Sequence, residues 1–300
     1  MCGRPWQRSR HSTFPRRHRR RRHHETAGDV TMKGEHRKIP VGVSRCLLGE
    51  AVRYDGRDRR NPYVTGCLDE RFRWIPVCPE VEIGLGIPRP PIRIERREGV
   101  VRLVMPDGNL DLTERMTTYA RNRVAELADA GIRGFLLKKR SPSCGLLGVD
   151  VHGGDRIDPT GTGFFAAALR SRFPNMPLAQ EDTLDDPLLR ETFILQVQIY
   201  DHFRKWREGK PTPKGLQRFH MAHRHLLRHT PRIDQALGRI ATQGEVFPDL
   251  LDTYETMLMA ALARPEGARK PGTSRTPPRS IERTDPTNFE PDPFESSETR

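Results

Sequence analysis

Short apolar segments alternate with helix-like segments between residues 36 and 182, and this order most limits the folds open to the chain. Strands are predicted at residues 39–44, 73–77, 100–104, within a hairpin begun at 92–94, and 134–138. Helical spacing of apolar residues follows at 113–131, with Thr113 as the expected N-cap, and at 164–173. This order predicts an α/β fold with a mostly parallel, Rossmann-like sheet. Pro76 would then be tolerated only near an edge or an end of the sheet.

The pattern changes near residue 183. Helices are predicted at 187–207, 215–228, 231–242 and 249–263. The first has an apolar stripe made of Leu188, Phe193, Ile194, Val197, Tyr200 and Phe203. We therefore expect four parts: a leader at 1–35, an α/β domain at 36–182, a small all-α domain at 183–263 and a tail at 264–300. Their composition predicts that the leader and the tail are disordered.

Positive charge is concentrated at the N-terminus. Residues 1–39 hold twelve Lys or Arg and three Asp or Glu, which is +9 of the formal net charge of +13. A basic tail that binds nucleic acid is one interpretation. A dispensable extension is the other, favoured because Met32 offers a second start just before the first strand. No apolar run resembles a signal peptide or a membrane span of ~20 residues, so we expect a soluble, cytoplasmic protein.

Three of the five cysteines share one setting. Cys46, Cys78 and Cys144 each come just after a predicted strand, whereas Cys67 does not and Cys2 lies in the leader. The carboxyl ends of parallel strands meet at one edge, where open α/β sheets bind ligands. Turns at these positions expose backbone N–H groups, which stabilise thiolates. The pattern therefore predicts that the three thiols meet.

The residues alone leave three interpretations of that meeting point. Three thiolates can hold zinc with water as a fourth ligand. They can also hold an iron–sulfur cluster, in which one iron is left open as a Lewis acid. The third interpretation is ordinary burial, since free cysteine is among the most buried residue types. The odd cysteine count and wide spacing argue against a disulfide framework.

Three motifs, at residues 43–56, 77–89 and 137–145, occur in order and closely resemble a bacterial family long labelled a domain of unknown function. That family includes the thiouracil desulfidases. The resemblance implies that Cys46, Cys78 and Cys144 bind a [4Fe–4S] cluster whose fourth iron takes sulfur from a thiolated base. It also implies a non-redox desulfuration, in which water replaces sulfur on the carbon.

Two polar side chains are candidates for assisting this chemistry. Glu80, in Cys-Pro-Glu, is the candidate for moving protons. Its alternative role is a glutamate favoured by the start of a helix. Ser141 is the first candidate for positioning substrate or water and Ser143 the second, although serine is also common in turns. Glu82 is expected to be structural.

The helical part resembles a second family of unknown function, found behind the first in YbgA-like proteins. Residues 216–227 and 237–240 carry this likeness. YbgA-like proteins continue into another long helical segment, so we expect a truncated helical domain here. His220, His223 and His225 allow a metal site, because residues i and i+3 share a helix face. A basic helix that faces solvent or nucleic acid is the favoured alternative.

The sequence thus predicts an iron–sulfur desulfidase acting on a small thiolated compound, such as a thiouracil-like base or nucleoside. One alternative is a nucleic-acid-binding module with a structural metal site, using the leader or the helical part. Another is a partner that transfers sulfur in tRNA thiolation.

Overall fold

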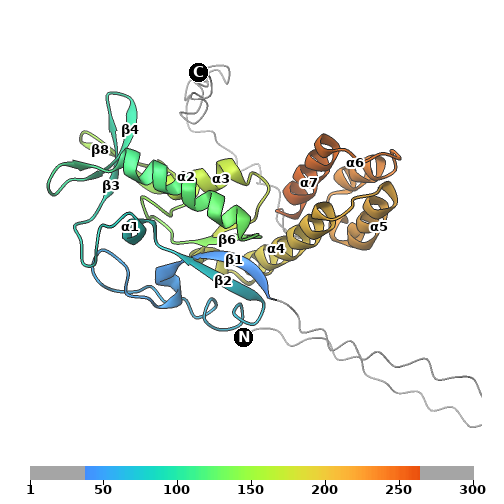
Figure 1. Cartoon of the computed structure of the whole chain (residues 1–300), viewed down its shortest axis with the longest axis horizontal. Helices are drawn as coiled ribbons and strands as arrows, with labels where there is room; N and C mark the ends of the chain where they lie inside the picture. Colours follow the sequence, from blue (N-terminus) through green and yellow to red (C-terminus); the bar gives the residue numbers. More distant parts are fainter. Residues whose placement is uncertain (1–37, 264–300) are drawn as a thin grey trace, which may run out of the picture. The chain divides into compact units, whose positions relative to one another are not determined.

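The computed structural model describes residues 38–263 (Figure 1). The predictions for the leader and the tail fall on residues outside this range. Within it, no helix is long and apolar enough to cross a membrane.

A four-stranded parallel sheet forms the centre of the α/β part. Its order is β2-β1-β6-β9, with β1 at Ile39–Ser44, β2 at Phe72–Val77, β6 at Phe135–Leu137 and β9 at Leu178–Gln180. The predicted parallel sheet with helices is therefore confirmed. Pro76 lies in β2, which is an edge strand of this sheet, as its missing N–H requires.

Helices cover both faces of this sheet because its strand residues alternate between two apolar clusters. Phe135 and Leu137 of β6 belong to one cluster with helices α2 (Thr113–Asp129) and α3 (Phe164–Arg172). Figure 1 shows these two helices side by side. Leu136 belongs to the other cluster, which includes the first half of α4 (Pro187–Glu208).

A second, mixed sheet of five strands was not predicted as a separate unit. Its order is β5-β4-β3-β7-β8, with β3 at Arg93–Arg97, β4 at Val100–Met105, β5 at Leu110–Asp111, β7 at Val149–Gly153 and β8 at Arg156–Gly161. The expected hairpin is its β3–β4 pair. The β7–β8 hairpin escaped prediction because β8 is polar and exposed, which leaves no apolar alternation to recognise.

The predicted C-terminal helical region is confirmed. After α4 come α5 (Pro213–His223), α6 (Pro231–Ala241) and α7 (Pro248–Leu262). Each of these four helices has proline near its start, where the missing N–H is harmless. The helix predicted to reach residue 228 ends instead at His223, and a 3-10 turn, Arg224–Leu227, follows it.

Two local predictions were wrong. The N-cap of α2 is Leu112, and the Thr113 hydroxyl instead accepts a hydrogen bond from the Leu103 amide of β4 at 2.9 Å. Leu188 does not join the apolar stripe of α4: it is 47% exposed because it lies in the first turn, outside the packed part of the helix.

Close packing between β1 and β6 generates a stability prediction at Gly42. A Cβ atom at this position would lie 2.1 Å from Cδ2 of the fully buried Phe135. We expect Gly42→Ala to lower the free energy of unfolding by about 1–3 kcal/mol, because the ring has no free space to move into. Urea denaturation measures this change in the free energy of unfolding. The control is Gly153→Ala, where the new methyl group meets nothing, and an equal loss in both variants would contradict the argument.

Candidate active site

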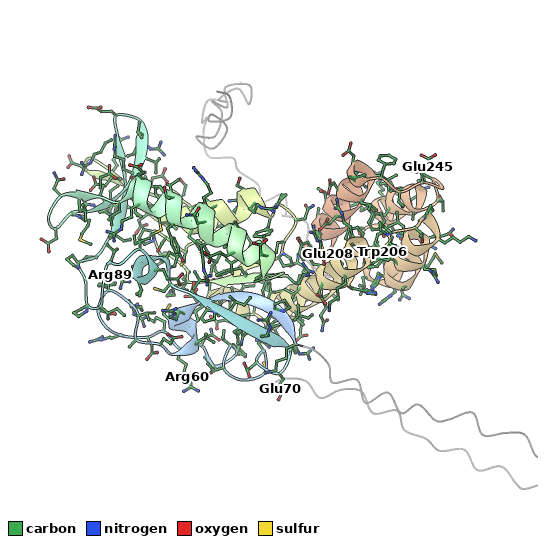
Figure 2. All side chains as sticks on the ribbon, in the orientation of Figure 1. Arg60, Glu70, Arg89, Trp206, Glu208 and Glu245 are labelled. Carbon is green, nitrogen blue, oxygen red and sulfur yellow. The ribbon has the colours of Figure 1, made fainter. Side chains whose placement is uncertain are left out.

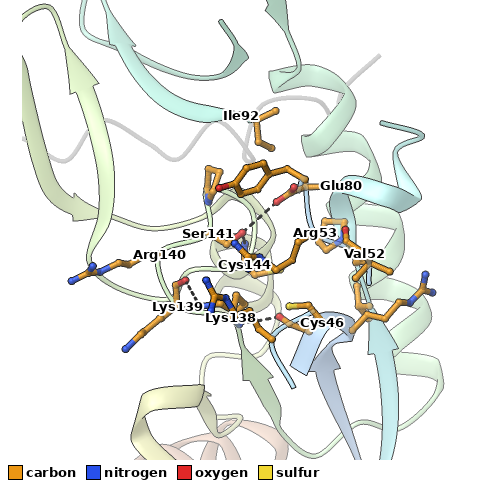
Figure 3. Close-up of a pocket in the computed structure, with 18 of the residues that line it drawn as sticks. Cys46, Val52, Arg53, Glu80, Ile92, Lys138, Lys139, Arg140, Ser141 and Cys144 are labelled. Carbon is orange, nitrogen blue, oxygen red and sulfur yellow. Dashed lines mark hydrogen bonds between the residues drawn. The ribbon is translucent and has the colours of Figure 1, made fainter. Parts of the chain in front are cut away.

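Cys46, Cys78 and Cys144 line one pocket of about 570 Å³. The three strands that precede them, β1, β2 and β6, are neighbours in the parallel sheet, so their carboxyl ends open on the same edge. The three cysteines therefore line the same pocket, as their places after these strands predict, and their role as ligands stays a prediction. Figure 3 shows Cys144 beside Ser141 in this pocket, with Cys46 and Lys138 below them.

Each cysteine is held by a different local structure. Cys46 lies in a 3-10 turn (η1, Arg45–Leu48) that ends at Gly49, whose φ of 96° suits glycine. Cys78 is the N-cap of the short helix α1 (Pro79–Glu82). Cys144 lies in a turn whose backbone N–H donates to the Ser141 hydroxyl at 3.1 Å. These turns follow the strands within a few residues, which leaves the thiols little freedom.

Burial strongly favours the protonated thiols. Burial, with a smaller contribution from the neighbouring Cys78 charge, raises the pKa of the Cys46 thiol to about 12. Burial likewise raises the pKa of Cys144 well above its ordinary value, against a hydrogen bond with Ser44 that lowers it. Metal ions bind thiolates rather than thiols, so loading this site would release protons.

Glu80 is fixed at the pocket by an arginine that the sequence did not single out. Arg89 donates from Nε and Nη2 to one oxygen of Glu80, Oε2, at 3.1 and 2.6 Å. Its Nη1 donates to the carbonyl oxygens of Val52 and Gly86. Only 2% of the Arg89 side chain is exposed, so this ion pair is shielded from water. In Figure 2, Arg89 lies beside α1.

The other oxygen of Glu80 faces two serines. Ser143 donates from Oγ to Glu80 Oε1 at 2.6 Å, while Ser141 Oγ is 3.4 Å from the same oxygen. The two hydroxyl oxygens are 3.0 Å apart. Ser141 lines the pocket, whereas Ser143 is fully buried behind it. Both hydroxyls therefore donate to the same Glu80 oxygen, and only Ser141 also reaches the pocket.

The pocket is basic. Two carboxylates, Glu80 and Glu181, line it together with seven cationic side chains: Arg45, Arg53, Arg59, Arg89, Lys138, Lys139 and Arg140. Lys138 donates to Glu181 at 2.5 Å. In the range that the structure describes, the buried Nη1 of Arg53 has no hydrogen-bond partner. A pocket of this kind favours an anionic ligand.

Glu82 and Cys67 lie outside the pocket lining. Glu82 accepts a hydrogen bond from the Cys78 amide at 2.8 Å and another from the Tyr119 hydroxyl at 2.6 Å. It therefore ties the Cys78 turn to α2, which is the structural role expected of it. Cys67 packs against the apolar cluster that contains Val41 and Leu47.

The Arg89–Glu80 pair generates a second stability prediction. We expect Arg89→Met to lower the free energy of unfolding by about 3–5 kcal/mol, because it strands the Glu80 carboxylate and the buried Val52 carbonyl group. Equilibrium denaturation of the protein measures the loss. Arg73→Met, which removes an exposed arginine from β2, serves as the control. Adding Glu80→Gln to Arg89→Met should recover part of the loss, and no recovery would contradict the assigned pairing.

Comparison with known proteins identifies the family of the chain. The sequence profile of a family described as 2-thiouracil desulfurase matches residues 41–181. The uncharacterized protein YbbK of Bacillus subtilis (strain 168) is 30% identical over 136 residues, which cover 43% of this chain and 87% of YbbK. A solved structure described as the [4Fe-4S]-dependent thiouracil desulfidase TudS is 34% identical, and the match covers 53% of this chain and 99% of TudS with a TM-score of 0.43. The chain belongs to the 2-thiouracil desulfurase family.

Proposed function

We propose that the protein removes sulfur from a small thiolated compound, such as a thiouracil-like base or nucleoside, with a [4Fe–4S] cluster on Cys46, Cys78 and Cys144. The observation that carries this proposal is the convergence of three thiols and the Glu80 network on one pocket. Membership of the 2-thiouracil desulfurase family supports the reaction class. The overall reaction replaces C=S by C=O, consuming water and releasing hydrogen sulfide, so that no electrons are transferred.

The donor set fits the proposed cofactor. Three thiolates and no fourth are what a cluster with one open iron needs. Within residues 38–263, no three His, Cys, Asp or Glu side chains are gathered tightly enough to enclose one metal ion. A zinc ion on the same three thiolates, with water as its fourth ligand, is the alternative that metal analysis separates from the cluster. When bound, the cluster would supply a Lewis-acidic iron for the sulfur of the substrate.

Glu80 and the two serines are suited to moving a proton. Arg89 keeps one Glu80 oxygen occupied, so only Oε1 is available to accept a proton. The buried Ser143 donates to that oxygen, and Ser141, at the pocket wall, contacts both the same oxygen at 3.4 Å and the Ser143 hydroxyl at 3.0 Å. A water or substrate group at Ser141 can therefore pass a proton along the two hydroxyls to Glu80. In the reverse direction the same chain returns the proton to the departing sulfide.

The cationic lining favours the anionic form of the substrate. A thiolated base exchanges a proton between ring nitrogen and sulfur, and its deprotonated form carries negative charge on sulfur. Arg53, Lys138 and Arg140 place positive charge around the pocket, which stabilises this form and holds its sulfur near the cysteines.

Iron content tests the proposed ligands. After anaerobic purification we expect about four iron and four acid-labile sulfide per chain, as a [4Fe–4S] cluster contains. Replacing Cys46, Cys78 or Cys144 by alanine should remove them, whereas Cys67→Ala, the matched control, should keep them. A colourless protein with one zinc ion, or a cluster that also needs Cys67, would refute the proposed site.

Turnover of 2-thiouracil tests the roles of the polar residues. We expect Glu80→Gln and Ser141→Ala to lower the rate of uracil formation by about 10²–10⁴-fold, the usual contribution of a positioned acid–base group. Iron content should stay at the level of the unchanged protein, which separates lost chemistry from lost cluster. Full activity in Glu80→Gln would exclude Glu80 as the proton-moving group.

A further inference from the structure

The histidines of the helical region are arranged differently from the expected pair. His220 and His223 are one turn apart on α5, but they point into different surroundings. His220 is buried, with its Nδ1 atom 3.3 Å from the Tyr254 hydroxyl and its Nε2 atom 3.6 Å from Asp234. His223 instead faces His202, a residue of α4 that the sequence pattern did not single out.

His202 and His223 bring two ring nitrogens together at the surface. Nδ1 of His202 and Nε2 of His223 are 3.2 Å apart. Phe219 packs against both rings, with centroid distances of 5.2 Å to His202 and 4.3 Å to His223. The ring of Phe219 is itself buried and contacts Phe203. Both imidazoles are therefore held in place, although His202 is exposed and His223 half-buried.

The backbone determines which nitrogen of His223 carries its hydrogen. Nδ1 of His223 is 2.8 Å from the Phe219 carbonyl oxygen, which can only accept a hydrogen bond. Nδ1 therefore holds the hydrogen in the neutral ring, and Nε2 presents a lone pair toward His202. An Nδ1–H bond to a backbone carbonyl is one of the contacts that orient metal-binding histidines.

We infer that His202 and His223 form a second metal site, which takes a divalent transition-metal ion between α4 and α5. Two nitrogens bound to one ion at about 2.0–2.1 Å in tetrahedral geometry lie about 3.4 Å apart, close to the spacing observed here. His202 would bind through Nδ1, moving its hydrogen to Nε2 on the exposed side of the ring.

Water completes the coordination. No third His, Cys, Asp or Glu between residues 38 and 263 joins these two as a ligand. The site is open to solvent on the His202 side, so exchangeable waters can occupy the remaining positions. Imidazole binds Zn²⁺, Ni²⁺ and Cu²⁺, and affinity rises from nickel to copper. The ion would link the end of α5 to α4, the helix whose first half packs against the parallel sheet.

Calorimetric titration with Ni²⁺ tests this site in the full-length chain. Five histidines before residue 38 would also bind nickel, so His11, His18, His23, His24 and His36 are first replaced by glutamine in every protein compared. In this background we expect a Ni²⁺ site, besides any binding at the cysteine pocket, whose affinity falls at least about tenfold in His202→Asn and in His223→Gln, since each removes one of two protein ligands.

His225→Asn is the matched control. His225 is an exposed histidine two residues from His223, and its Nδ1 atom also lies near a backbone carbonyl, that of Ala222, at 3.1 Å. The nickel affinity of the His225→Asn variant should equal that of the background protein. Far-UV circular dichroism and iron content of each variant confirm that the fold and the cysteine site are unchanged. Absence of nickel binding in the background protein, or equal affinity in His202→Asn, would overturn the inference.

Discussion

Parallel pairing of β1 with β2 and β6 is the constraint on which the site depends. Neighbouring strands lie about 4.8 Å apart and point the same way, so whatever follows them gathers at one edge. Cys46, Cys78 and Cys144 come from segments separated by more than thirty residues of chain, and no local interaction could bring them together. Gly42 shows how tight this pairing is, since the ring of Phe135 fills the space where a Cβ atom would be.

Charge placement then gives the pocket its chemical character. Arg89 pairs with one Glu80 oxygen and leaves the other for the serines, while Glu181 holds Lys138 near Cys46. Both ion pairs are partly shielded from water, which makes the loss of either partner costly. Both carboxylates thus have a structural role, because each fixes a cation at the pocket, and Glu80 also keeps one oxygen that can accept a proton.

The sequence predicted β1, β2 and β6 because each contains a short apolar run with a turn after it, whereas β9, which is only three residues long, was missed. It also predicted that Cys46, Cys78 and Cys144 lie at one edge of the sheet, because each cysteine follows a predicted strand after a few residues. Arg89, Glu181 and His202 could not be found this way. Lys138 and Glu181 are 43 residues apart, and His202 and His223 are 21 apart on different helices, so only the packed fold defines these partners. The second sheet was missed because β8 is polar and β5 is only two residues long.

Helix α4 connects the α/β part, which holds the cysteine pocket, with the helical region, which holds the His202–His223 pair, because its residues belong to two apolar clusters. Its first half, with Phe193 and Val197, packs beneath β1, whereas Tyr200 and Phe203 belong to the cluster shared with α5 and α7. Arg133, just before β6, pairs with Asp201 and Glu208 on the second half. A boundary near residue 182 remains a prediction, yet the continuity of α4 means that its two halves cannot move independently without breaking helix hydrogen bonds. Anything that restrains α4 near His202 therefore also restrains the helix that supports the strand leading to Cys46.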